Sequence, residues 1–109
     1  MKRRVVLRPA VPDDLHSIVA HLDQHSESAG DRFIASVFAT FDDLSDMPGK
    51  GSPKDFPRSG LAGVRSWALP GFPNHLIYYQ THAEAIIVLA VLHGARDVPR
   101  ILEERSPRA

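Results

Sequence analysis

The residues best suited to chemistry follow the most apolar run of the chain. The run Ala85–Leu92 predicts a strand buried in the middle of a sheet, and His-Gly-Ala-Arg-Asp at 93–97 follows it directly. An unperturbed imidazole titrates near neutral pH, so His93 at a strand end could act as a general acid or base. Structural alternatives stay open, because His93 could hold the corner by a hydrogen bond and Arg96 could pair with a carboxylate.

A second pair of candidate side chains lies near the N-terminus. His21 and His25 are four residues apart, a spacing at which two imidazoles on a helix could share a metal ion. A third ligand would have to come from Asp14, Asp23 or elsewhere, and the chain has neither a His-Glu-x-x-His pattern nor any cysteine. A solvated polar helix face explains the pair better, so we predict no metal site and no cofactor.

Length and composition limit the kinds of protein this can be. The 109 residues fit one domain, 1–109, and the absence of cysteine agrees with a reducing compartment. The basic start of the chain has only three apolar residues before Arg8, against roughly 7–15 in an export signal. We therefore predict a cytoplasmic protein that does not bind membranes.

The formal net charge is zero, but the charges are unevenly distributed. Residues 1–10 carry four bases and no acid (+4), residues 11–47 carry eight acids against one base (−7), and the remainder carries eight bases against five acids (+3). A surface with both signs favours a protein partner of mixed charge. Direct sequence-specific binding of nucleic acid is not expected, since it calls for a clearly basic domain.

Two amphipathic helices are predicted after a short strand at residues 4–8. In the first helix Pro12 suits the opening turn, and apolar residues follow at helical spacing. They are Leu15, Ile18, Val19 and Leu22. For the second helix, Ser28 and Asp31 predict a capping box, and its apolar stripe ends before Met47. The stripe contains Phe33, Ile34, Val37, Phe38, Phe41 and Leu44. The short link predicts an antiparallel hairpin whose stripe is core.

The second half of the chain predicts strands. Residues 48–63 have the proline and glycine content of a long loop. Three strands, at 64–69, 75–80 and 85–92, are separated by turns at 70–73 and 81–84 and form an antiparallel meander. Asp97 can cap a last short helix that has Pro99 in its first turn. The order β-α-α-β-β-β-α predicts an α+β fold with the helices on one face of the sheet.

Several of these segments together resemble a known family. Pro48-x-x-Gly51, the segment Leu-Ala-Gly-Val-Arg at 61–65, and Phe72–Asp97 occur in the order and spacing of the ParE branch of the RelE/ParE superfamily. The resemblance covers nearly the whole chain. It implies the toxin of a bacterial type II toxin-antitoxin pair, with a helical hairpin packed on a small, four-stranded antiparallel sheet.

The superfamily has two activities, and the residues must decide between them. RelE-like members cleave messenger RNA on the ribosome, which requires a base for the 2′-hydroxyl, a proton donor and cations at the phosphate. Trp67 stands where that branch tends to carry a second Lys, and residues 98–109 contain neither Tyr nor His. An endoribonuclease, the alternative interpretation, would use Arg65, His75, His93 and Arg96.

The preferred interpretation is a ParE-like toxin that inhibits DNA gyrase by binding and is not an enzyme. The resemblance implies a ribbon-helix-helix antitoxin whose C-terminal segment wraps across the hairpin and the sheet edge. The predicted effector surface is Arg65, His93, Arg96 and Arg100. The predicted antitoxin-binding residues are Leu15, Leu22, Phe38 and Phe41. A degenerate member, which binds its antitoxin without being toxic, is a further alternative.

Overall fold

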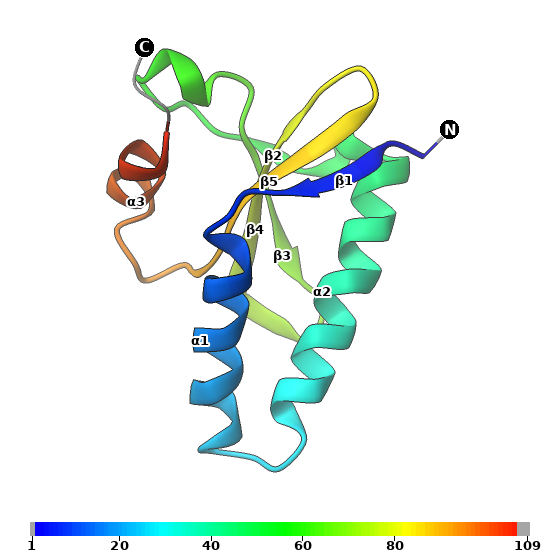
Figure 1. The fold of residues 1–109 in the computed structure, drawn as a ribbon, viewed down its shortest axis with the longest axis vertical. Coiled ribbons are helices and arrows are strands. Elements are labelled where there is room, and N and C mark those ends of the chain that lie inside the picture. The colour runs from blue at the N-terminus through cyan, green and yellow to red at the C-terminus, as the bar shows by residue number, and fades with distance from the viewer. Residues whose placement is uncertain (1, 107–109) are drawn as a thin grey trace.

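The computed structural model describes residues 2–106 and confirms the α+β class (Figure 1). Its strands and helices are β1 (Arg4–Leu7), α1 (Val11–Asp23), α2 (Ala29–Asp46), β2 (Ser52–Pro53), β3 (Arg65–Leu69), β4 (Phe72–Thr81), β5 (Ala85–His93) and α3 (Val98–Arg105). Short 3-10 turns at Pro48–Lys50 and Ser59–Leu61 flank β2. Within residues 2–106, no helix has the length and apolarity needed to cross a membrane.

The sheet has the order β1-β5-β4-β3-β2, and β3, β4 and β5 form the predicted antiparallel meander. Two details differ from the expected four-stranded antiparallel sheet. β1 pairs in parallel with β5, with Val5 opposite Ile86 and Leu7 opposite Val88, so the sheet is mixed. The predicted loop also contains β2, which pairs with β3 as a fifth strand. In both cases the local sequence pattern of a strand does not indicate which other strand it pairs with.

The turn before β4 is tighter than expected. β4 starts at Phe72, inside the segment predicted as a turn, and the reversal is confined to Pro70 and Gly71. Gly71 has φ 81°, a left-handed conformation that glycine adopts without a steric penalty. The pairing of β3 with β4 is irregular between Ala68 and Leu69, next to this turn.

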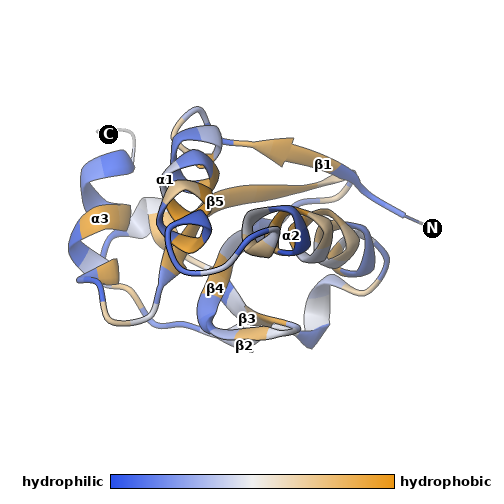
Figure 2. Cartoon of the chain, turned by 90° about the horizontal axis from the view of Figure 1, so that it is seen from below, coloured by the Kyte–Doolittle hydropathy of each residue, from blue (hydrophilic) through white to orange (hydrophobic). Residues whose placement is uncertain are grey.

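Helices cover both faces of the sheet, and not one face as predicted. The α1–α2 hairpin lies along one side of the sheet, and α3 lies apart from it (Figure 1). The apolar stripes of the hairpin pack on the core around Phe33, Tyr79 and Val88. α3 packs through Leu102 on a second buried cluster with Leu89. Buried on both faces, β5 is hydrophobic along most of its length (Figure 2).

A bulge in β5 changes which face of the sheet the side chains near the end of this strand point to. Tyr78 pairs with Ala90 and Tyr79 with Val88, so Leu89 is an extra residue without a partner on β4. The cores follow this shift, since Val88 and Val91 lie in the hairpin-side cluster while Leu89 and Ala90 lie in the α3-side cluster. The bulge therefore sets which backbone groups of β5 reach the strand's outer edge.

The link between the two helices does not use the predicted capping box. Ser28 has φ 65° and makes no side-chain cap. Instead, the Gly30 N–H donates to Asp23 Oδ1 at 2.9 Å, across the hairpin. A Cβ at Gly30 would lie 2.6 Å from that oxygen and 2.7 Å from Val19 Cγ1, so this close approach requires glycine. The predicted cap of the last helix is confirmed, because Asp97 accepts from the Arg100 N–H at 3.4 Å.

Candidate functional site

Arg65 lies at the start of β3 and is used to hold a loop. Its guanidinium donates to the carbonyl oxygens of Gly51, at 2.7 Å, and Gly49, at 3.3 Å. The Tyr79 hydroxyl donates to Pro48 O at 2.6 Å and accepts from the Gly51 N–H at 3.0 Å. Burial raises the pKa of Tyr79, so it stays a neutral donor. The Pro48-x-x-Gly51 motif is thus an anchored turn, and a side chain at Gly51 would collide with the tyrosine hydroxyl.

The four residues of the nuclease alternative are not brought together. Arg65 is opposite Tyr79 on β4, whereas His93 is opposite His75 on the same strand. Four residues of strand separate the two positions, which corresponds to about 13 Å. Arg65 therefore lies at the other end of the sheet from the histidines, and the predicted effector surface is divided in the same way.

Three of the predicted residues do share one groove. His75 and His93 face each other across β4 and β5 with ring centroids 5.1 Å apart, and Arg96 follows His93 in the loop. With His21 on α1, these side chains line a groove of about 410 Å³. His75 also packs edge-on against the ring of Phe33, with centroids 5.3 Å apart. Burial, followed by the nearby His93 and His21, lowers the pKa of His75.

His93 holds the corner and keeps one nitrogen free. The Ala95 N–H donates to His93 Nδ1 at 3.0 Å, as the structural alternative from the sequence proposed. A ring nitrogen that accepts a hydrogen bond carries no proton, so the neutral ring holds its proton on Nε2. The structural alternative for Arg96, pairing with a carboxylate, is not found: its guanidinium has no hydrogen-bond or acidic partner within residues 2–106.

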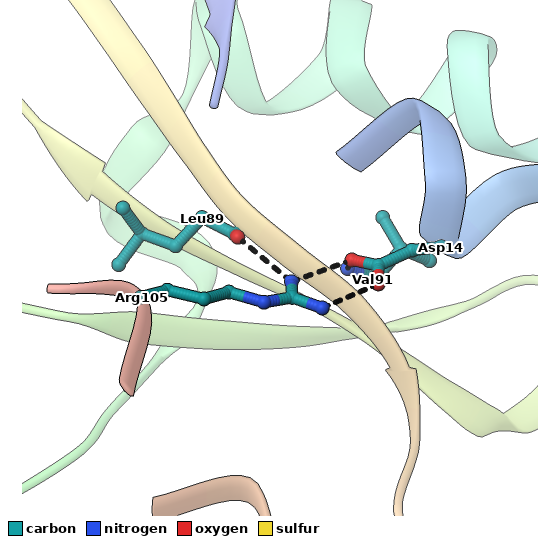
Figure 3. Close-up of polar contacts among 4 residues, drawn as sticks. All are labelled: Asp14, Leu89, Val91 and Arg105. Atoms are coloured by element: carbon teal, nitrogen blue, oxygen red, sulfur yellow. Dashed lines mark hydrogen bonds and ion pairs between the residues drawn. The ribbon is translucent and has the colours of Figure 1, made fainter. Parts of the chain in front are cut away.

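Sequence reasoning missed the most buried ion pair of the described chain. Asp14 on α1 and Arg105 on α3 form a bidentate pair, with Nη2 to Oδ1 at 2.6 Å and Nη1 to Oδ2 at 2.8 Å (Figure 3). Asp14 also accepts from the Val91 N–H at 3.1 Å, and Arg105 Nη1 donates to Leu89 O at 3.3 Å. The Asp14 carboxylate raises the pKa of Arg105. No sequence signal links two residues 91 positions apart.

The Asp14–Arg105 pair forms hydrogen bonds with backbone groups of β5 that no strand pairs with in the described chain. β1 ends at Leu7, opposite Val88, so beyond this point β5 has no neighbouring strand on that side among the described residues. Unpaired backbone groups on such an edge need other partners. The carboxylate and the guanidinium supply them and tie α1, β5 and α3 together (Figure 3).

The predicted antitoxin-binding residues differ in how accessible they are. Leu15 and Phe41 are buried in the core, and Leu22 is partly buried against it. The side chain of Phe38 is 53% exposed. It borders an apolar hollow of about 260 Å³ between α2 and β1, the outermost strand. Val5 on that strand is 37% exposed. Only Phe38 of the four thus offers a large apolar surface to a partner.

The described part of the chain does not bring together a set of side chains that could bind a metal ion. The rings of His21 and His25 are 4.9 Å apart in an edge-on arrangement. Among residues 2–106, no group of three or more His, Asp or Glu side chains is placed to hold a metal ion. His21 is exposed on α1, and His25 is exposed in the link that follows this helix.

These elements define a small α+β protein with the ParE-like fold: a helical hairpin on one face of a small sheet and a short C-terminal helix on the other. The family model described as "ParE toxin of type II toxin-antitoxin system, parDE" matches residues 5–98. The chain therefore belongs to the ParE toxin family of type II toxin-antitoxin systems.

Solved structures agree on the fold. The chain is similar to one from the "Chromosomal ParDE TA system from P. aeruginosa", with a TM-score of 0.67 and 14% sequence identity. The match covers 84% of this chain and 96% of that chain. No curated protein matches the sequence. At this identity the structural match supports the fold, and membership of the family follows from the family model.

Proposed function

We propose that this ParE family toxin acts by binding DNA gyrase, and that a cognate antitoxin neutralises it. The observation that carries the proposal is the division of the cationic residues. Cleavage of RNA needs a base, an acid and cations around a single phosphate. Arg65 is instead bound to loop carbonyls at one end of the sheet, while His93 and Arg96 lie at the other. A surface of separate polar groups suits binding of another protein.

The competing function is endoribonuclease activity by the groove residues alone. His75, His93 and Arg96 share one groove, so a base, an acid and a cation are near one another. Two observations weigh against it. His75 is partly buried and packed on Phe33, and its lowered pKa reduces the fraction of the ring that is protonated and able to act as the acid. Residues 98–109 contain no Tyr or His that could serve instead.

We infer that the antitoxin binds between α2 and the free edge of β1. Val5 and Phe38 are exposed there, and within residues 2–106 no strand pairs with the outer side of β1. An extended segment can pair with such an edge, and an amphipathic helix can place apolar side chains in the hollow beside Phe38. The adjoining Lys2–Asp42 ion pair, at 2.6 Å, offers both charges to a partner. The C-terminal segment of a ribbon-helix-helix antitoxin fits this surface.

Two parallel assays test the target. Purified toxin is added to gyrase supercoiling and cleavage reactions, and to translating ribosomes with a reporter message. Inhibition of gyrase with intact message supports the proposal. Cleavage of the message with gyrase unaffected refutes it in favour of the nuclease, and inactivity in both assays indicates the degenerate member.

The antitoxin surface is tested by Phe38→Asp with Ala39→Asp as the matched control. Both positions are exposed on α2, and both changes add one negative charge. Only position 38 borders the hollow. We expect Phe38→Asp to weaken binding of the cognate antitoxin at least tenfold in calorimetry, because an exposed aromatic anchor is lost. Equal affinity of the two variants would place the antitoxin elsewhere.

A further inference from the structure

The groove between α1 and the corner after β5 has an apolar floor and a polar rim. Ile18, Val91 and Leu92 form the floor. The rim consists of Asp13, Asp14, Ser17, His21, His75, His93 and Arg96. A volume of about 410 Å³ is in the range of small-ligand sites, which combine apolar walls with a few fixed polar groups. The shape suits an aliphatic chain that ends in a polar group.

The charges of the rim indicate the sign of that polar group. Asp14 is already satisfied by Arg105, so it adds little free negative charge, and Asp13 is the other carboxylate of the rim. Arg96 is exposed and has no partner within residues 2–106. His93 has Nδ1 occupied by the Ala95 N–H, which leaves Nε2–H as a donor. A guanidinium and an imidazole N–H at the same rim form a donor pair suited to a carboxylate.

We propose that this groove binds an acidic side chain of a partner protein, its carboxylate at Arg96 and His93 and its aliphatic stem over Ile18 and Leu92. The inference rests on the proposed function, in that it gives the chemistry by which the target is recognised. A nucleic acid backbone fits less well. Among the described residues Arg96 is the rim's only guanidinium, and tight binding of a polyanion needs several cations.

The probe is glutarate, which carries a carboxylate at each end of a short aliphatic chain. Binding is followed by NMR through the imidazole signals of His75 and His93 and the methyl signals of Leu92. Glutaramide, of the same shape without charge, and inorganic phosphate are titrated in parallel. We expect saturable binding of glutarate, with shifts at these residues, and affinity at least tenfold weaker for glutaramide and for phosphate.

Arg96→Gln tests the residue, with Arg100→Gln as the matched control. Both arginines are exposed, but Arg100 pairs with Glu104 at 3.0 Å and lies outside the groove. Loss of a charged hydrogen bond should weaken glutarate binding about tenfold or more in Arg96→Gln and leave Arg100→Gln unchanged. Because the Arg96 side chain makes no hydrogen bond or ion pair within the described chain, the variant is expected to fold normally, which circular dichroism checks.

The outcomes separate this inference from the proposed function. Absence of saturable glutarate binding, equal weakening in both variants, or phosphate binding as tightly as glutarate would each overturn the carboxylate site. If gyrase is inhibited by the wild type and equally by Arg96→Gln, the function holds and the inference fails. If glutarate binds at Arg96 but gyrase is unaffected, the groove is confirmed as a carboxylate site and the proposed target is wrong.

Discussion

The ion pair between Asp14 and Arg105 leads to the sharpest prediction of stability. Replacing Arg105 by Leu keeps much of the side-chain volume but leaves the Asp14 carboxylate, whose side chain is 5% exposed, without its cation. Breaking one partner of a buried pair typically costs about 3–5 kcal/mol. Because the Arg105 side chain is 26% exposed, water can replace part of the interaction, and we expect about 3 kcal/mol.

The free energy of unfolding is measured by urea denaturation, with Arg100→Leu as the control. The Arg100–Glu104 pair is exposed on the same helix and is worth less than about 1 kcal/mol. The double variant Asp14→Leu/Arg105→Leu removes the unpaired carboxylate as well. It also leaves the Val91 N–H and the Leu89 carbonyl without the side chains that bond them. We therefore expect it to recover only part of the loss. Equal destabilisation by Arg105→Leu and Arg100→Leu would refute the role assigned to the pair.

Two further predictions concern His75 and Tyr79. The pKa of His75 is lowered in the folded state, so the unfolded chain takes up the proton first, and stability should fall as the pH drops below about 6.5. His75→Gln should flatten this loss between pH 7.5 and pH 5 in urea midpoints, whereas the exposed control His82→Gln should keep the wild-type slope. Tyr79→Phe removes the hydroxyl that bonds Pro48 and Gly51 and should cost about 1–3 kcal/mol. The hydroxyl of Tyr78 bonds nothing in residues 2–106, so Tyr78→Phe should change stability by less than about 0.5 kcal/mol. Equal losses of stability in Tyr79→Phe and Tyr78→Phe would contradict the anchoring role of Tyr79.

The sequence alone predicted the elements whose signals are local. The α1–α2 hairpin follows from apolar residues at helical spacing, and β5 follows from one uninterrupted apolar run. The cap at Asp97 was also predictable, because it involves residues only three apart. Ser28 shows the limit of local rules, since the N–H of Gly30 is satisfied by Asp23 from the preceding helix.

Only the tertiary structure decided which distant residues meet. The parallel pairing of β1 with β5, the Asp14–Arg105 pair and the groove around His75 and His93 join segments far apart in the chain. The same structure separated Arg65 from the histidines with which the nuclease alternative had grouped it. Helical and strand periodicity is set by each residue's near neighbours, whereas strand partners and buried ion pairs are selected by packing of the whole chain. That packing was beyond the reach of any local pattern.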